Sequence, residues 1–216
     1  MSIKHNPGQI ERNTAAGNLI YRWAHDPSNT VFVDIGSWNG KGTTQCIMDA
    51  LIKRFDDCVC YSLETNREFH LIAKEYWDSK LQGYNSIISS RLQLMHGRII
   101  EPEEVPSLEE VMKSKHSHNQ WPRFYKEFFD AVDDGCPNVM NTLPESIDVL
   151  ILDGGEFTTY AEYQKLKDRS RIIFCDDSSK YKCEKIRAEL LEDKNFKVIV
   201  DEPTDRNGFC AFERVE

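Results

Sequence analysis

The chain has 216 residues and a formal net charge of −9, from 27 Lys and Arg against 36 Asp and Glu. Its length suits one domain, because domains usually span about 100–200 residues. The acidic balance gives no basic field to attract phosphate backbones or anionic lipid, so nucleic-acid and membrane roles are not expected. With 40% hydrophobic residues the chain has enough apolar side chains for a packed core.

The seven cysteines are scattered and form no C-x-x-C pair with metal-ligand spacing, so we expect reduced thiols in the core. The first residues are polar and lack the apolar stretch of a signal peptide. No run approaches the roughly 18 apolar residues that a bilayer span requires. The sequence therefore predicts a cytoplasmic protein.

The first elements alternate between helix and strand. Ile10, Leu19, Ile20 and Trp23 recur at helical intervals and predict an N-terminal helix over about 8–25. An apolar run at 30–35 then predicts a strand buried on both faces. A helix over 42–55 and a strand over 58–64 follow in the same manner.

The alternation continues to the end of the chain. We expect helices over 67–80, 159–167 and 182–192, and strands over 92–96, 147–153, 171–176, 196–200 and 209–213. This order predicts an α/β fold: a doubly wound, mostly parallel, seven-stranded Rossmann-like sheet with helices on both faces. The last two strands are joined by a loop too short for a parallel crossover, so they should form an antiparallel hairpin.

One long stretch, about 98–146, exceeds what a crossover needs and predicts an insertion with helices of its own. Its aromatic residues include two i, i+4 pairs, Phe124 with Phe128 and Tyr125 with Phe129, which are typical of the buried face of a helix. Trp121 is the ring that we expect to stay exposed, where it would contact an acceptor molecule.

A glycine-containing loop, Asp34-Ile35-Gly36-Ser37-Trp38-Asn39-Gly40, follows the first strand. Open parallel sheets bind ligands at the carboxyl ends of their strands, so this loop is the expected cofactor loop. The glycine spacing does not match the dinucleotide motif G-x-G-x-x-G. A phosphate-binding P-loop needs four residues between its first glycine and Gly-Lys, whereas three stand here, and Gly42 precedes Thr43 where Ser or Thr should follow directly. The apolar strand that ends in Asp153 is similar in sequence to the Mg²⁺-binding strand of an NTPase. A P-loop-like NTPase is therefore an alternative interpretation.

The chain resembles class I S-adenosylmethionine-dependent methyltransferases in three features. These are the pattern Asp34-x-Gly36-x-x-x-Gly40 after the first strand, the acid Glu64 at the end of the second strand, and the antiparallel hairpin predicted at the end of the sheet. Within that family the chain is most similar to metal-dependent small-molecule O-methyltransferases of the catechol and macrocin (sugar) types. The resemblance implies one methyltransferase domain over residues 1–216, with S-adenosyl-L-methionine as cofactor.

The resemblance also implies how the cofactor is held. Glu64 would accept hydrogen bonds from the ribose hydroxyls, as the paired oxygens of a carboxylate allow, unless it is merely an exposed acid at a strand end. His96, Gly97 and Arg98, at the end of the third strand, would border the adenine. The expected cofactor-binding residues are Asp34, Gly36, Ser37, Trp38, Gly40, Thr43, Glu64, Gly97 and Arg98.

Three acids follow two strands that should be neighbours: Asp153 ends the fourth strand, and Asp176 and Asp177 end the fifth. Carboxylates this close repel one another, so a cation is expected among them, and oxygen-only ligands favour Mg²⁺ or a similar divalent ion. Helix capping by Asp153 or Asp177 is the alternative. The metal-dependent relatives have Asp, Asp, and Asp or Asn at these positions.

A metal at this site would lower the pKa of an acceptor hydroxyl and fix its oxygen near the methyl group. Asp153 and Glu156 are the expected catalytic residues; Glu156 would be a base, a fourth ligand or an exposed loop acid. Relatives have a lysine or a second acid where this chain has Glu156 and Gly155, so an inactive cofactor-binding module also stays open.

The sequence thus predicts a metal-assisted O-methyltransferase that acts on a sugar, a glycan or a similar small polyhydroxylated acceptor. The sugar preference rests on the macrocin-like Gly-x-Trp-x-Gly loop. A homo-oligomer is compatible with this prediction.

Overall fold

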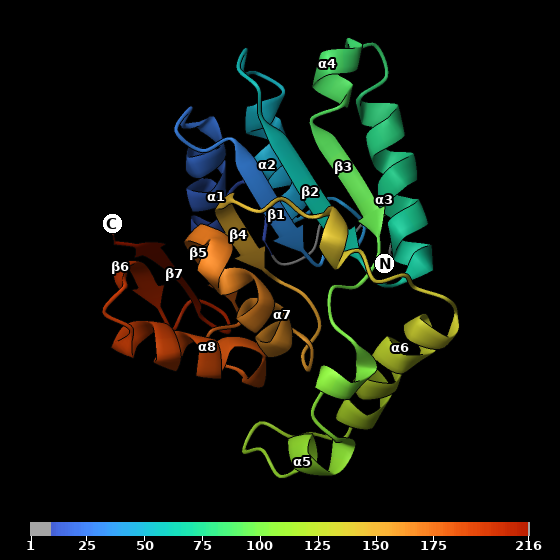
Figure 1. The fold of residues 1–216 in the computed structure, drawn as a ribbon, viewed down its shortest axis with the longest axis vertical. Coiled ribbons are helices and arrows are strands. Elements are labelled where there is room, and N and C mark those ends of the chain that lie inside the picture. The colour runs from blue at the N-terminus through green and yellow to red at the C-terminus, as the bar shows by residue number, and fades with distance from the viewer. Residues whose placement is uncertain (1–9, 216) are drawn as a thin grey trace.

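Seven strands lie side by side in one sheet, in the order β3-β2-β1-β4-β5-β7-β6 (Figure 1). The computed structural model describes residues 10–215. The strands are β1 Val31–Ile35, β2 Val59–Glu64, β3 Leu92–His96, β4 Ile147–Leu152, β5 Ser170–Asp176, β6 Phe196–Glu202 and β7 Phe209–Arg214. β7 runs antiparallel to both β5 and β6, and the other pairs are parallel, which confirms the predicted sheet and hairpin.

Helices cover both faces of the sheet, as predicted. α1 (Ala15–His25), α2 (Thr43–Leu51) and α3 (Arg67–Lys80) share one buried apolar cluster, and α7 (Thr159–Leu166) and α8 (Tyr181–Glu192) share a second one on the other face. α1 begins later than predicted because the Thr14 side chain caps it by accepting from Gly17 N at 3.0 Å. Residues 8 and 9 of that prediction lie outside the described residues.

The insertion has helices of its own, α5 (Leu108–Met112) and α6 (Trp121–Asp133), flanked by the 3₁₀ turns η2 (Pro102–Glu104) and η3 (Met140–Thr142). In Figure 1 the arrows of β1, β2 and β3 point toward the end of the molecule where α5 and α6 lie. The insertion therefore stands at the carboxyl ends of the parallel strands. Two further short elements, α4 (Ser86–Ser89) and η4 (Lys167–Arg169), had no counterpart in the prediction.

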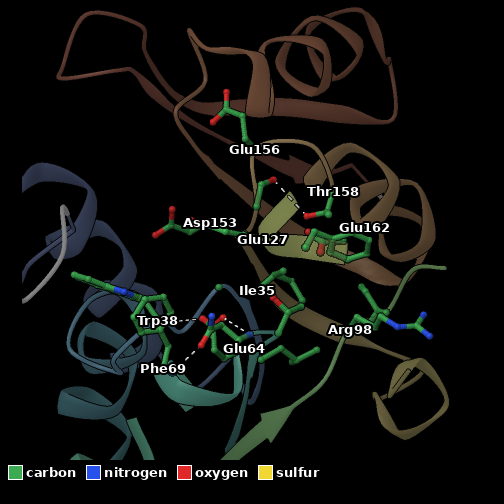
Figure 2. A pocket seen from close by; sticks show the side chains of 18 of the residues that line it. Ile35, Trp38, Glu64, Phe69, Arg98, Glu127, Asp153, Glu156, Thr158 and Glu162 are labelled. Carbon is green, nitrogen blue, oxygen red and sulfur yellow. Dashed lines mark hydrogen bonds between the residues drawn. The ribbon is translucent and has the colours of Figure 1, made fainter. Parts of the chain in front are cut away.

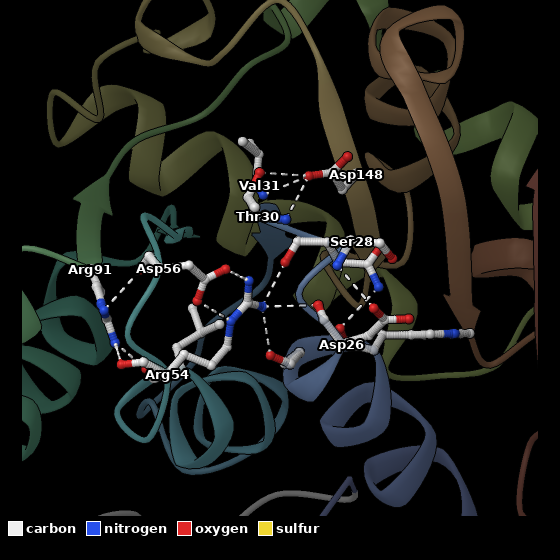
Figure 3. A network of polar contacts seen from close by, with 12 residues as sticks. Asp26, Ser28, Thr30, Val31, Arg54, Asp56, Arg91 and Asp148 are labelled. Atoms are coloured by element: carbon white, nitrogen blue, oxygen red, sulfur yellow. Dashed lines mark hydrogen bonds and ion pairs between the residues drawn. The ribbon is translucent and has the colours of Figure 1, made fainter.

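The opposite end of the sheet is closed by a polar network (Figure 3). The buried Arg54 guanidinium donates to the carbonyls of Ala24 and Asn29 and pairs with Asp56. Nearby, Asp148 of β4 accepts from the backbone N–H groups of Thr30 and Val31 at 2.7 and 2.9 Å. These bonds tie the loop before β1 to the helix before it and to the neighbouring strand.

All seven cysteines are buried and unbridged, as predicted for core thiols. Within residues 10–215, none of the helices combines the length and the apolar character that a bilayer crossing needs.

Candidate functional site

The loop between β1 and α2 makes a tight turn that only glycine allows at its start. Gly36 has φ +99°, and a Cβ there would lie 2.3 Å from the carbonyl oxygen of Asp153. The amides of Gly36 and Ser37 both donate to the carbonyl of Leu63, at 3.0 and 2.8 Å. The turn is thus fixed between β2 and the end of β4, with its backbone against both.

Gly40 ends the same turn in close contact with α3. The indole N–H of Trp77 donates to the Gly40 carbonyl at 2.9 Å, and a Cβ on Gly40 would lie 2.8 Å from that indole nitrogen. The Gly40 amide closes the turn by donating to the Ser37 carbonyl at 2.8 Å. Both glycines singled out from the sequence therefore have a steric reason in the structure.

Asp34 lies beneath this loop rather than in a cavity. Its carboxylate is fully buried and accepts from the hydroxyls of Thr43 (2.8 Å), Thr44 (2.6 Å) and Ser62 (3.1 Å). Burial raises the pKa of Asp34, and these hydroxyl donors oppose the rise. Because Asp34 is fully buried beneath the loop and lines neither cavity described below, it positions the loop and the start of α2 rather than contacting a ligand as expected.

Glu64 ends β2 and connects the loop to α3. One carboxylate oxygen accepts from Trp38 N and the other from Asn66 N, both at 2.8 Å. Burial raises the pKa of Glu64 to about 7, against the lowering effect of these amides. Trp38, at φ +45°, is held in this uncommon conformation by the bond to Glu64, and its ring meets Phe69 edge-on.

A cavity of about 380 Å³ opens at the carboxyl ends of β1, β2 and β4 (Figure 2). Eight of the predicted site residues line it: Gly36, Trp38, Glu64, Gly97, Arg98, Asp153, Glu156 and Asp177. A second cavity of about 340 Å³ shares Gly36, Trp38 and Asp153 with the first and is also lined by Ser37 and Thr43. Because they share walls, the two cavities are lobes of one cleft.

The three predicted acids do come together at the cleft, but the cation among them belongs to the chain. Lys182 Nζ lies 2.9 Å from Asp153 Oδ1, 2.8 Å from Asp177 Oδ2 and 3.9 Å from Asp176 Oδ2. The Lys182 side chain is only 6% exposed. Arg206 also pairs with Asp176, at 2.8 Å. Within residues 10–215, no group of three or more His, Cys, Asp or Glu is arranged to hold a metal ion.

The charges in this cluster set one another's protonation. Burial alone would lower the pKa of Lys182, but Asp153, Asp176 and Asp177 raise it well above its ordinary value. Burial and the neighbouring Asp153 carboxylate raise the pKa of Asp176 to about 7. Burial also opposes ionisation of Asp177, yet the Lys182 ammonium outweighs it and lowers that pKa. The expected Mg²⁺ site at Asp153, Asp176 and Asp177 is therefore not supported, because an ammonium occupies its centre.

Trp121 does not meet the expectation of an exposed ring. It is 1% exposed and packs edge-on against Phe157 and Tyr181, with ring centroids 5.2 and 5.1 Å away. Phe124, by contrast, is 38% exposed and lines the first cavity together with Glu127 and Phe128 of the same helix. The insertion does contribute to the cleft, but through side chains of α6 other than Trp121.

Two buried ionisable residues of the cleft were not predicted, Lys182 and Glu162. Lys182 lies in the first turn of α8, five residues after Asp177, and side chains there tilt back toward the strand ends. That position was a usable signal. Glu162, on α7, is 3% exposed, lines the first cavity, and has an oxygen, Oε2, without a hydrogen-bond partner in the described part of the chain. Burial raises the pKa of Glu162 to about 7.

Comparison with known proteins gives a consistent result for the fold. No family model and no curated protein matches the chain. Among solved structures, a putative O-methyltransferase from Klebsiella pneumoniae is 13% identical, with 99% of this chain and 86% of that chain covered, at a TM-score of 0.56. An O-methyltransferase from Bacillus cereus, solved in complex with SAH, is 10% identical over 94% and 82% of the chains, at 0.55.

A methyltransferase from Geobacter sulfurreducens is 12% identical, with 94% of this chain and 80% of that chain covered, at a TM-score of 0.56. Identities this low report on the fold alone. The strand order, the single antiparallel strand and these likenesses together show that the chain has the fold of class I methyltransferases.

Proposed function

We propose that this protein is an S-adenosylmethionine-dependent O-methyltransferase that acts on a hydroxyl of a sugar, a glycan or a similar small polyhydroxylated molecule. The observation that carries the proposal is the cleft, in which the Gly36 turn and the Glu64 carboxylate face one cavity at the carboxyl ends of β1 and β2. Proteins of the same fold have been solved with SAH or SAM bound.

The cleft has polar groups suited to that cofactor. Ser37 Oγ and Glu162 Oε2 are buried, line the cleft and have no partner within residues 10–215, so hydroxyl or amino groups of a ligand would satisfy them. Each oxygen of Glu64 accepts one backbone amide and has a second lone pair for a ribose hydroxyl. The missing Cβ at Gly36 lets the backbone approach the ligand closely.

The NTPase alternative has less support. A P-loop lysine must reach the phosphates from the loop, whereas Lys41 Nζ lies 4.9 Å from the centre of the Tyr76 ring. Lys41 lines neither lobe of the cleft. The strand that ends in Asp153 resembles an NTPase strand only in sequence, because Asp153 is paired with Lys182.

The acceptor would enter beside α6. The rings of Phe124 and Phe128 offer apolar faces to the C–H groups of a sugar, and the carboxylates of Glu127 and Glu156 offer acceptors for its hydroxyls. A bound S-adenosylmethionine would supply an electrophilic methyl group for in-line transfer. Glu156, whose pKa is raised by burial, would take the proton of the acceptor hydroxyl as the acceptor oxygen bonds to the methyl carbon; the bond from that carbon to sulfur would break, and S-adenosylhomocysteine would leave. No step is assigned to a metal, because the acid cluster does not fit one.

Calorimetry with S-adenosylhomocysteine and with ATP tests the proposal. We expect the first to bind and ATP not to bind, and we expect Glu64→Ala to weaken the binding by at least about tenfold, the value of one charge-assisted hydrogen bond. Glu192→Ala, which removes an exposed acid at the end of α8, is the matched control and should change nothing. Tight ATP binding without S-adenosylhomocysteine binding would overturn the proposal.

A screen of hydroxylated acceptors with a labelled methyl donor would then identify the substrate class. Methyl transfer to sugar or polyol hydroxyls is the expected result. Binding of S-adenosylhomocysteine without transfer to any acceptor would instead favour a cofactor-binding module.

A further inference from the structure

Sheet geometry alone forces three carboxylates together at one end of the cleft. β4 and β5 are parallel neighbours, with Leu152 opposite Cys175, so Asp153 and Asp176 leave the sheet side by side. Adjacent strands are about 4.8 Å apart, and Asp177 follows at once, so the three groups cannot separate. Burying this much like charge is unfavourable unless a cation lies among the carboxylates.

Lys182 is that cation, and its position is hard to explain otherwise. It lies in the first turn of α8, where the helix dipole disfavours positive charge. Its side chain is buried, which disfavours an ammonium further. Two ammonium–carboxylate contacts, at 2.9 Å to Asp153 and 2.8 Å to Asp177, compensate for both effects.

A divalent ion and this ammonium cannot occupy the cluster together. Mg²⁺ needs oxygen ligands at about 2.0–2.1 Å and Ca²⁺ at about 2.3–2.6 Å, around one centre. The Lys182 ammonium lies at hydrogen-bond distance from two of the three carboxylates that would form that centre. Asp176 is further committed to Arg206, through contacts of 2.8 and 3.2 Å. Metal binding would have to displace one buried cation and compete with a second.

We propose that the Lys182 ammonium takes the place of a divalent cation at this site: it holds Asp153, Asp176 and Asp177 together, and the protein needs no metal there. An ammonium has three N–H donors, and two of them point to Asp153 and Asp177. Lys182 lines both lobes of the cleft, so the third donor can bind the acceptor oxygen and stabilise the negative charge that it develops. This last role rests on the proposed function; the exclusion of metal does not.

Titration with Mn²⁺ tests whether the acid cluster excludes divalent metal ions, without any assay of activity. Binding is followed by calorimetry and by the electron paramagnetic resonance signal of the unbound ion. The wild-type protein should show no saturable binding up to about 1 mM, the weak end of protein sites for divalent ions. Lys182→Ala should gain Mn²⁺ binding by at least about tenfold, because three carboxylates lose their cation. Mn²⁺ should also raise the melting temperature of that variant.

Two variants control for the substitution. Lys185→Ala removes an exposed lysine from the same helix and should leave Mn²⁺ binding as weak as in the wild type. Lys182→Ala combined with Asp177→Asn should lose the gained affinity, because one of the three carboxylates is gone. Binding of Mn²⁺ to the wild type at micromolar concentration would overturn the proposal, and this measurement decides even if the Lys182 variants do not fold.

Activity gives a second, separate readout. Methyl transfer by the wild type should be unchanged within about twofold when a chelator replaces Mg²⁺, the reverse of what the three acids alone predict. Strict dependence on Mg²⁺ would contradict metal exclusion while leaving the methyltransferase proposal intact. Absence of methyl transfer under all conditions would contradict the proposed function, whereas the Mn²⁺ titration would still test whether the acid cluster excludes metal.

Discussion

Substitution of Gly36 by alanine tests whether the β1–α2 turn is as tightly fixed as the structure indicates. The added Cβ would lie 2.3 Å from the Asp153 carbonyl oxygen, whereas ordinary contact begins at 3.4 Å, so the two backbones must separate by 3.4 − 2.3 = 1.1 Å. Three loop hydrogen bonds hold them in place: Gly36 N and Ser37 N to Leu63 O, and Asp153 N to Ile35 O at 3.0 Å.

The expected cost has two parts. A left-handed conformation costs an alanine about 1–2 kcal/mol. Weakening two or three of the loop bonds adds roughly 2–3 kcal/mol, at about 1 kcal/mol each. The sum, roughly 3–5 kcal/mol, corresponds to a fall in melting temperature of about 10 °C for a chain of this length. Binding of S-adenosylhomocysteine should be lost at the same time, because the moved turn forms the wall of the cleft.

Gly83→Ala is the matched control. Gly83 has nearly the same backbone conformation, φ +95°, but a Cβ there meets nothing within 4 Å. Gly83→Ala should therefore lower the free energy of unfolding only by the conformational cost, about 1–2 kcal/mol. Differential scanning calorimetry of both variants, with and without S-adenosylhomocysteine, isolates the steric part. Equal melting temperatures and equal affinities for the two variants would refute the close packing of this turn against β4.

Three further predictions concern the other groups of the site. The melting temperature of Glu64→Gln, relative to wild type, should rise from pH 5 to pH 8. The pKa of Glu64 is raised from 4.5 to about 7, so the contribution of this group to the stability of the wild type is fully present below pH 4.5 and is lost as the pH rises through 7. A difference in melting temperature that does not change with pH would contradict this. Trp121→Ala should lower the free energy of unfolding, measured by chemical denaturation, by about 3–5 kcal/mol, because Trp121 is buried. Phe124→Ala should leave that free energy almost unchanged and should instead raise KM for the acceptor. The opposite pattern in chemical denaturation would indicate that Trp121, and not Phe124, contacts the acceptor. Asp34→Ala should lower the free energy of unfolding by about 3 kcal/mol or more, because three hydroxyls lose a buried acceptor. Asp34→Asn keeps the shape of the side chain and should lower it less. Equal losses for the two variants in urea unfolding would contradict the hydrogen-bonding role of Asp34.

Most of the fold could be predicted from the sequence because each buried strand is a short apolar run with a clear end. The strand over 92–96 and the helix over 67–80 were predicted with their observed bounds. The position of Glu64 in the cleft followed from the same logic, since it directly ends a parallel strand. The start of the first helix, the end of the second helix (predicted at 55, observed at Leu51), the bounds of the helices in the insertion and the two short elements near 86 and 167 required the three-dimensional structure.

The site was less predictable because its chemistry depends on partners distant in sequence. The three acids indicated a cation correctly, but the sequence did not show that Lys182 would fold back onto them. Asp34 lost its expected ligand role to hydroxyls from two other elements. Trp121 and Phe124 are one helical turn apart, and only the packing of α6 against Phe157 decides which ring is buried.

The bonds of Asp148 at the far end of the sheet have a consequence for how such a protein can diversify. The chain leaves the sheet after β3, passes through the insertion and returns as β4, so a change of length in the insertion would shift the register of that strand if nothing else held it. Asp148 fixes β4 against β1 with its own side chain, through the amides of Thr30 and Val31, at the end remote from the insertion. The register of β4 is therefore held at the end of the sheet remote from the insertion, so a change in the length of the insertion can be accommodated without a shift of this strand against β1.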